Sequence, residues 1–252
     1  PDACLQDLEQ YGTMSFTEVI ADARDLAANG FPVHQFLSNG IRETEESYRL
    51  WDENREIFLP DGKVPEVGTL FFQKDLGKTF DCMAEAEKRA QAAGASREQA
   101  LAAAREEFYT GGTGKKITDF HSANGGLLTE DDMAGFSSEI EEPLAFDFGD
   151  YTVLTHGAWC QGPVMPMALN ALSGLALLGM GHNSVESLHT MAESLNFVLP
   201  YRERLFRDSK VIYVPLSRLL TSRDGTTRRE CIPRGHAWPF TSPPLRPLPA
   251  PG

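Results

Sequence analysis

A long hydrophobic stretch between residues 151 and 180 predicts a strand, a tight loop and a helix in succession. Thr152, Val153 and Thr155 are β-branched, which favours a short strand. The glycines at 157 and 162 indicate a loop, and Pro163 suits the first helical position, where a missing N–H costs nothing. We expect this strand–loop–helix unit to lie at the centre of the fold.

The helix that begins at Pro163 is apolar almost all round. Its apolar residues form two stripes at helical spacing: Val164, Ala168, Leu172 and Leu175 on one, and Met165, Leu169 and Ala176 on the other. It has about 16 residues at most and contains Pro166, Asn170 and Gly174, so it is too short and too interrupted to span a bilayer. The pattern therefore predicts a core helix that is buried on two sides.

Local capping signals predict further helices. Ser15 with Glu18, and Ser96 with Gln99, form capping boxes, and Thr129 is a plausible N-cap before an acidic first turn. A helix capped by residues 181–184 is expected to carry one apolar face, made of Val185, Leu188, Ala192, Leu195 and Leu199. Another stripe at helical spacing consists of Leu76, Phe80, Met83 and Ala84.

Two other stretches have a structural and a functional interpretation. Residues 42–56 carry many charges, and a solvated helix face with a few inward anchors is favoured over an acidic binding site. The glycine-rich run from Tyr109 to Gly114, followed by Lys115 and Lys116, invites a phosphate-binding interpretation. A phosphate-binding loop follows a strand, whereas this run follows a predicted helix. A turn at the end of that helix is therefore favoured.

Charge and cysteine content limit the partners and the kinds of site that this chain can have. A net charge of −13 argues against nucleic-acid partners, which require a basic surface, and against anionic membranes. The four cysteines are far apart, and none forms a C-x-x-C or Cys/His pair that would indicate a zinc site or a disulfide framework. We predict no cofactor and no metal site. The chain starts at Pro1 without a methionine, so we expect that an N-terminal piece is missing.

The stretch from Asn124 to Phe136 resembles the γ-glutamyltransferase (γ-glutamyltranspeptidase) family, and matching pieces run through most of the chain. They are Tyr11-Gly12-Thr-Met-Ser-Phe16, Ala27-Ala-Asn-Gly-Phe-Pro-Val33, Gln73-Lys-Asp-Leu76 leading to Phe80, Phe108-Tyr109 with Gly111, Gly125-Gly126 through Asp132, Pro143-Leu144, and residues 151–180. The run Trp159-Cys-Gln-Gly-Pro163 is closer to the acylase- or hydrolase-like branch than to the Pro-Pro-Ser-Ser-Gly-Gly form of the glutathione enzymes. Tyr201 and residues 207–209 depart from the family pattern.

The resemblance implies an N-terminal-nucleophile hydrolase with a four-layer αββα sandwich. In such enzymes a precursor cuts itself before a threonine, whose freed α-amine activates its own hydroxyl for acyl transfer. The fold class is then α+β, a partial sandwich that is mostly helical in this chain, with the strand at residues 151–155 and a second strand near residues 144–148. The implied substrate is a small γ-glutamyl or related amide, and the implied partner is the C-terminal small-subunit portion that carries the nucleophile. We expect residues 1–239 to be part of this domain, and residues 240–252 to be a proline-rich tail without fixed structure.

No catalytic residue is assigned within this chain. Thr226 and Thr227 imitate the family's paired threonines, but they fall in an expected helix and only 25 residues follow Thr227. His182 and His189, near the start of a helix, are more simply explained as structural. Two hypotheses remain open: the chain is part of an acyltransferase or amidohydrolase precursor that is inert alone, or it is a non-catalytic helical binding domain or a decayed copy.

Overall fold

The computed structural model describes residues 1–208, 210–233 and 235–238. The chain forms two compact units, Pro1–Glu139 (unit 1) and Ile140–Gly252 (unit 2). Within the described ranges the ordered elements are mostly helices with few strands, as the sequence predicts. The tail expected at residues 240–252 lies outside the described residues, so the division at residue 239 stays a prediction.

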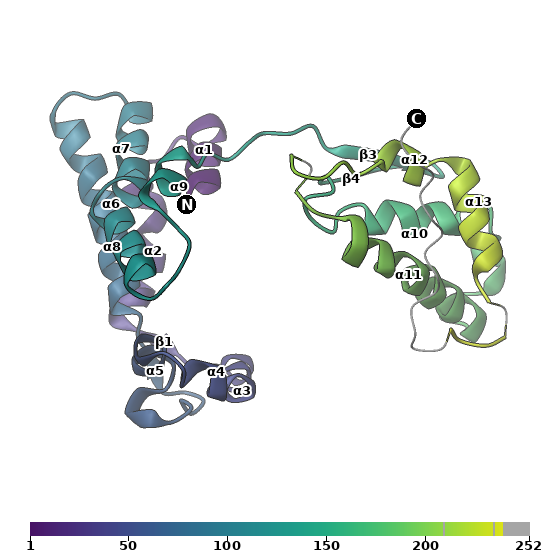
Figure 1. Cartoon of the computed structure of the whole chain (residues 1–252), viewed down its shortest axis with the longest axis horizontal. Helices are drawn as coiled ribbons and strands as arrows, with labels where there is room; N and C mark the ends of the chain where they lie inside the picture. Colours follow the sequence, from purple (N-terminus) through teal and green to yellow (C-terminus); the bar gives the residue numbers. More distant parts are fainter. Residues whose placement is uncertain (209, 234, 239–252) are drawn as a thin grey trace. The chain divides into compact units, whose positions relative to one another are not determined.

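Unit 1, all of whose residues are described, is mainly helical (Figure 1). Its helices are α1 (Asp2–Tyr11), α2 (Phe16–Asn29), α3 (Gln35–Glu43), α4 (Glu45–Tyr48), α5 (Asp52–Phe58), α6 (Lys74–Ala92), α7 (Arg97–Tyr109), α8 (Gly112–Ala123) and α9 (Glu130–Gly135), with a 3₁₀ turn at Pro60–Gly62. Two short strands, β1 (Phe31–Pro32) and β2 (Leu70–Phe71), pair antiparallel. Helices α2 and α7 both lie alongside α6.

The capping signals are confirmed in unit 1. Ser15, Ser96 and Thr129 cap α2, α7 and α9, each with a complete capping box. Met83 and Leu101 are buried together in the core between α6 and α7, at the helical spacing that the sequence shows. Other members of this core are Leu5, Phe16, Ala84 and Ala104. Leu76, expected on the same stripe as Met83, is instead 41% exposed at the start of α6.

A buried carboxylate joins α6 to the start of α2. Glu87 is only 1% exposed, and its two oxygens accept hydrogen bonds from the backbone N–H groups of Phe16 (2.7 Å) and Thr17 (2.8 Å). The Thr17 hydroxyl donates a third bond of 2.6 Å. The first N–H groups of a helix have no partner within the helix, and the N-terminal end of its dipole favours negative charge. Glu87 therefore caps α2 from a different helix.

A second buried carboxylate fixes α1. Asp2 is 1% exposed and accepts hydrogen bonds from the Arg105 side chain and from the backbone N–H of Ser138. Burial works to raise the pKa of Asp2, but the bonds from Ser138 and Arg105 outweigh it and hold the pKa below its usual value. Asp2 thereby ties α1 both to α7 and to the chain that follows α9.

The glycine-rich run after α7 is both a turn and the start of a helix. Helix α7 ends at Tyr109 as predicted, but α8 begins at Gly112, which the sequence analysis did not anticipate. A Cβ on Gly114 would lie 2.3 Å from the Tyr109 carbonyl oxygen, so glycine permits this close approach. The ammonium of Lys115 is paired with Asp119 (3.0 Å) and lies 3.8 Å from Glu130. The structural interpretation of this run is therefore favoured over phosphate binding.

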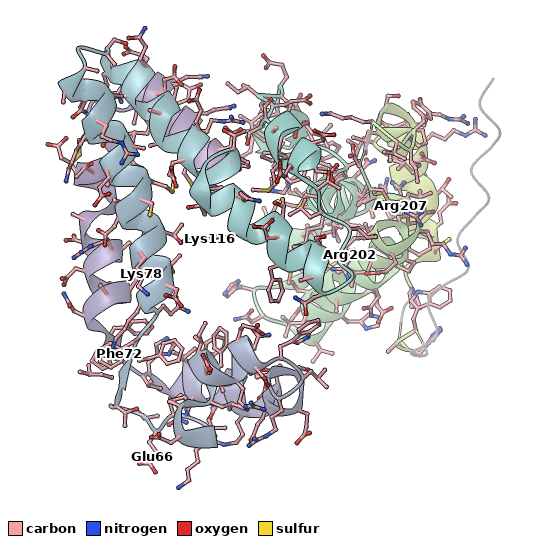
Figure 2. All side chains as sticks on the ribbon, turned by 60° about the vertical axis from the view of Figure 1, so that its left-hand side comes forward. Glu66, Phe72, Lys78, Lys116, Arg202 and Arg207 are labelled. Atoms are coloured by element: carbon pink, nitrogen blue, oxygen red, sulfur yellow. The ribbon has the colours of Figure 1, made fainter. Side chains whose placement is uncertain are left out.

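The charged stretch at residues 42–56 is a solvated surface, as predicted. Helices α4 and α5 have no fully buried residue, and their charged side chains face water or pair locally. Tyr48 is an inward anchor whose ring stacks on Phe58 at 4.4 Å between centroids. Leu50 and Trp51, in contrast, are 77% and 43% exposed. Figure 2 shows the side chains of this region beside the labelled Glu66 and Phe72.

Unit 2 contains the strand–loop–helix unit that the hydrophobic pattern predicts. Its elements are β3 (Leu144–Phe148), β4 (Tyr151–Thr155), α10 (Val164–Leu172), a 3₁₀ turn at Leu177–Met180, α11 (Val185–Leu205), α12 (Leu216–Leu219) and α13 (Ser222–Cys231). Both predicted strands are confirmed, and they pair antiparallel with Phe146 opposite Val153. Helix α10 contacts both α11 and α13. Among the described residues no helix is long and apolar enough to cross a membrane.

Helix α10 is shorter than predicted. It ends at Leu172, so Leu175 and Ala176 lie beyond it, because Gly174 adopts a left-handed backbone with φ of 83°. Met167 and Ala168 are buried, whereas Met165 is 57% exposed. The expectation of burial on two sides was therefore wrong for the stripe that includes Met165.

The apolar face that the sequence predicts on α11 is exposed. Ser184 caps the helix as expected, but Val185 is 86% exposed and Leu188 is 50% exposed. Leu195 and Leu199 share this face and are 44% and 36% exposed. The side chains that α11 buries include polar ones as well as apolar ones: Thr190, Glu193, Ser194, Phe197, Val198 and Tyr201. We call the exposed set of Val185, Leu188, Leu195 and Leu199 the outer face of α11.

A buried arginine holds α11, α12 and α13 together. Arg228 is 3% exposed, donates to the Leu219 carbonyl (2.7 Å), and places its guanidinium 5.5 Å from the ring centre of Tyr201. Burial lowers the pKa of Arg228 and raises the pKa of Tyr201. Tyr201, where the sequence departs from the family pattern, is thus part of the core of unit 2.

Candidate functional site

The paired threonines lie inside a helix. Thr226 and Thr227 are in the middle of α13, and the hydroxyl of Thr226 donates to the Ser222 carbonyl four residues earlier (3.0 Å). The Thr226 hydroxyl also accepts a bond from Arg229 (3.1 Å). A threonine nucleophile of the N-terminal type needs a free α-amine beside its hydroxyl. The backbone nitrogens of Thr226 and Thr227 are amides within the helix, which favours the expectation that neither is catalytic.

The two histidines singled out by the sequence occupy different settings. His182 is exposed in the turn before α11. His189 is half-buried on α11, and its Nε2 lies 2.7 Å from the Pro233 carbonyl, so this nitrogen carries the proton and donates it. Among the described residues, no serine, threonine or cysteine hydroxyl or thiol is hydrogen-bonded to a histidine. Nor does any cluster of histidine, cysteine or carboxylate residues in this part of the chain fit a metal ion.

The loop between β4 and α10 carries the Trp159–Pro163 run in a tight turn. A Cβ on Gly162 would lie 2.1 Å from the His156 carbonyl oxygen, so the loop folds tightly back on itself only with glycine there. The Trp159 ring is 5.6 Å from that of His156 and is 56% exposed. Trp159 of the Trp159–Pro163 run is therefore exposed at the surface, whereas Gly162 and Pro163 are buried.

Two side chains from distant positions hold this loop. Glu141, which precedes β3, accepts hydrogen bonds from the Trp159 indole N–H and from the Gly157 backbone (3.4 Å). Arg202, on α11, donates to Gln161 at 3.1 Å. Neither Glu141 nor Arg202 is predicted by the sequence pattern to contact this loop. No spacing rule links residue 141 or residue 202 to this loop, so the sequence carried no signal for these contacts.

An apolar groove lies beside the loop. It has a volume of about 580 Å³ and runs between α10 and α11. Its lining combines loop residues, such as His156 and Gln161, with Met165, Met191 and Leu195. The groove is continuous with the outer face of α11 through Leu195. A groove of this kind can bind the apolar surface of a ligand or partner, and the loop can supply polar contacts at one end of the groove.

Comparison with known proteins assigns the chain to a family. The family model described as gamma-glutamyltranspeptidase matches residues 3–247. The chain belongs to the γ-glutamyltranspeptidase family. The resemblance found in the sequence is thereby confirmed.

The relatives of this family member include hydrolase-like and acylase proenzymes. It is 29% identical over 219 residues to the glutathione hydrolase-like YwrD proenzyme of Bacillus subtilis (strain 168), covering 86% of this chain and 38% of that protein. It is 26% identical over 243 residues to the acylase ACY 1 proenzyme of Pseudomonas sp. (strain SE83), covering 93% of this chain and 39% of that protein. The chain therefore spans less than two fifths of the length of these two relatives.

A solved structure supports the fold. The γ-glutamyltranspeptidase of Helicobacter pylori superposes with a TM-score of 0.78 at 22% identity, over 93% of this chain and 63% of that one. At this identity the likeness concerns the fold alone. It agrees with the prediction that this γ-glutamyltranspeptidase family chain adopts a mostly helical portion of that fold.

Proposed function

We propose that this chain is the large-subunit portion of an N-terminal-nucleophile acyltransferase or amidohydrolase. The observation that carries the proposal is the family match along residues 3–247, combined with coverage of only 38–39% of two relatives that are named as proenzymes. The reaction would be attack of a threonine hydroxyl on an amide carbonyl, followed by release of the acyl group to water or an amine. The threonine would belong to a C-terminal portion outside this chain.

The outer face of α11 supports a partner of this kind. Four apolar residues at helical spacing are between 36% and 86% exposed, while the same helix buries Thr190, Glu193 and Ser194. Water-exposed apolar faces of this kind mark interaction sites. We propose that the nucleophile-bearing portion covers this face and that β3 and β4 join one of the two sheets of an αββα sandwich. Residues 1–239 would then be part of one functional domain.

The proposed substrate is a small γ-glutamyl or related amide. The run from Trp159 to Pro163 resembles the acylase-like branch, and one relative is an acylase proenzyme. Both observations support a substrate whose acyl group differs from the γ-glutamyl group of glutathione. The exposed Trp159, held by Glu141, and the groove beside it provide apolar surface near the loop. In the complete protein, these residues of the chain would contribute to positioning the partner or the acyl chain.

The proposal predicts that residues 1–252 alone do not hydrolyse a γ-glutamyl anilide, because the proposed threonine nucleophile lies outside this chain. The release of the coloured aniline should equal that of a buffer control, and Thr226→Ala and Thr227→Ala should change nothing. Turnover above the control that either substitution abolishes would place the nucleophile on α13 and overturn the proposal. A family hydrolase assayed in parallel shows that the conditions support turnover.

A further inference from the structure

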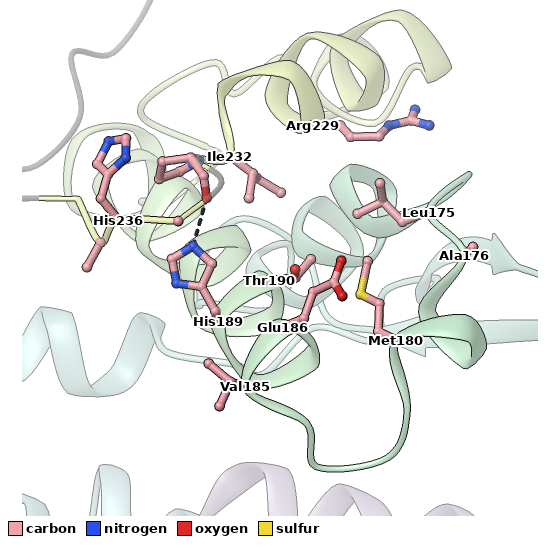
Figure 3. Close-up of a pocket in the computed structure, with 13 residues that line it drawn as sticks. Leu175, Ala176, Met180, Val185, Glu186, His189, Thr190, Arg229, Ile232 and His236 are labelled. Carbon is pink, nitrogen blue, oxygen red and sulfur yellow. Dashed lines mark hydrogen bonds between the residues drawn. The ribbon is translucent and has the colours of Figure 1, made fainter.

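The histidine in the larger cavity of unit 2 is already engaged. This cavity has a volume of about 830 Å³ and a largely apolar lining that includes Leu175, Met180 and Ile232. His189 reaches it from α11, but its Nε2 is bonded to the Pro233 carbonyl at 2.7 Å (Figure 3). A side chain whose chemistry is still available lies in unit 1 instead, in the loop between α8 and α9.

Three asparagines in this chain are followed by glycine: Asn29, Asn39 and Asn124. In such a pair the backbone nitrogen of the glycine can attack the side-chain amide carbon of the asparagine, because glycine has no Cβ to hinder the approach. All three asparagines are exposed, so exposure does not distinguish them. The glycine N–H does distinguish them, because a nitrogen that is held in a backbone hydrogen bond cannot turn toward the side chain.

Helices hold the first two of these pairs. The Gly30 N–H donates to the Leu26 carbonyl at 3.0 Å, and a Cβ at residue 30 would lie 2.7 Å from the Phe72 ring. The chain at Asn29 is therefore packed in place. Gly40 lies inside α3, where its N–H belongs to the hydrogen-bond ladder of the helix. Both pairs must be released from a helix before they can react.

The third pair lies in an open loop. Residues 124–127, directly after α8, are all exposed. Among the described residues the Gly125 N–H has no acceptor, whereas the next amide, that of Gly126, donates to the His121 carbonyl at 2.7 Å. Gly125 has a φ of 73°, and a Cβ there would have no neighbour within 4 Å. The backbone can therefore rotate at Asn124, as the attack requires.

The side chain of Asn124 also caps the end of α8. Its Nδ2 donates to the carbonyl of Phe120, in the last turn of the helix, at 2.9 Å. A carboxylate at residue 124 could not donate this bond, and its negative charge would meet the negative end of the helix dipole. Loss of the amide would therefore loosen the last turn of α8, where the Phe120 ring lies 6.2 Å from the Trp51 ring.

We propose that Asn124 is a site of spontaneous deamidation that weakens the end of α8. The Gly125 nitrogen forms a bond to Cγ of Asn124, and the bond from Cγ to the side-chain nitrogen breaks. That nitrogen leaves as ammonia, taking up the proton of the Gly125 N–H. Water then opens the five-membered imide and leaves aspartate or isoaspartate at residue 124. The site is separate from the acyl-transfer function proposed above and does not depend on it.

The test is peptide mapping by mass spectrometry of residues 1–252 aged in mildly alkaline buffer, once folded and once unfolded in guanidinium chloride. In the folded protein Asn124 should convert at least about tenfold faster than Asn29 or Asn39, because those two react only after local opening of a helix. In the unfolded chain the three sites should convert at similar rates, since the backbone bonds are lost. Asn124→Gln should abolish the fast conversion, and the matched control Asn39→Gln should leave it unchanged.

Hydrogen exchange on Asn124→Asp measures the effect of the product on α8. The amides of residues 120–123 should exchange about twofold to fivefold faster than in the unsubstituted protein. Asn39→Asp, on α3, should leave these amides unchanged. Conversion of Asn29 or Asn39 as fast as that of Asn124 in the folded protein would overturn the proposal. So would an Asn124 that converts only in the unfolded chain, or unchanged exchange in Asn124→Asp.

Discussion

Glu87→Ala is expected to lower the free energy of unfolding of unit 1 by about 3 kcal/mol, because it leaves three donors at the start of α2 without their charged acceptor. Those donors are the backbone N–H groups of Phe16 and Thr17 and the Thr17 hydroxyl. Urea denaturation followed by circular dichroism measures the change.

Glu85→Ala is the matched control for Glu87→Ala. Glu85 is on the same helix two residues earlier, is exposed, and should change the free energy of unfolding by less than about 0.5 kcal/mol. Equal effects of the two substitutions would show that Glu87 does not cap α2. Glu87→Gln should fall between them, because it retains one acceptor oxygen and loses the charge.

Met167→Ala should lower the free energy of unfolding of unit 2 by about 3 kcal/mol, since it opens a cavity in a packed core. Met167 is fully buried on α10 against Phe197, Val198 and Leu219. Met165→Ala, two residues earlier on the same helix, removes the same atoms from a side chain that is 57% exposed. It should cost less than about 0.5 kcal/mol. Thermal unfolding of both variants provides the comparison, and a large loss for Met165→Ala would contradict the arrangement of α10.

Signals that act over a few residues predicted most of the local structure. The two capping boxes, the Thr129 cap and the two strands are confirmed because their partners lie within three residues or across one turn. The length of α10 was wrong because a left-handed glycine at residue 174 ended the helix although the apolar pattern continued. Helix α8 was missed because glycines usually disfavour a helix, whereas here Gly114 relieves a contact with the preceding helix.

The outer face of α11 shows a different limit of sequence analysis. Apolar residues at helical spacing indicate that a face needs cover, but they do not indicate which segment supplies it. Val185 and Leu188 are exposed, and the described residues of unit 2 pack instead against Phe197 and Val198. The motif at Trp159 located the candidate loop, while Glu141 and Arg202 depend on tertiary structure that one sequence does not reveal.

The central claim, that the nucleophile lies outside this chain, is tested most directly by intact-mass spectrometry. Purified residues 1–252 are incubated for days at neutral pH and then with an electrophilic glutamine analogue that acylates or alkylates threonine nucleophiles. The account predicts one unchanged mass for the whole chain, without cleavage and without an adduct. Two fragments divided before Thr226 or Thr227, or an adduct on either residue, would contradict it.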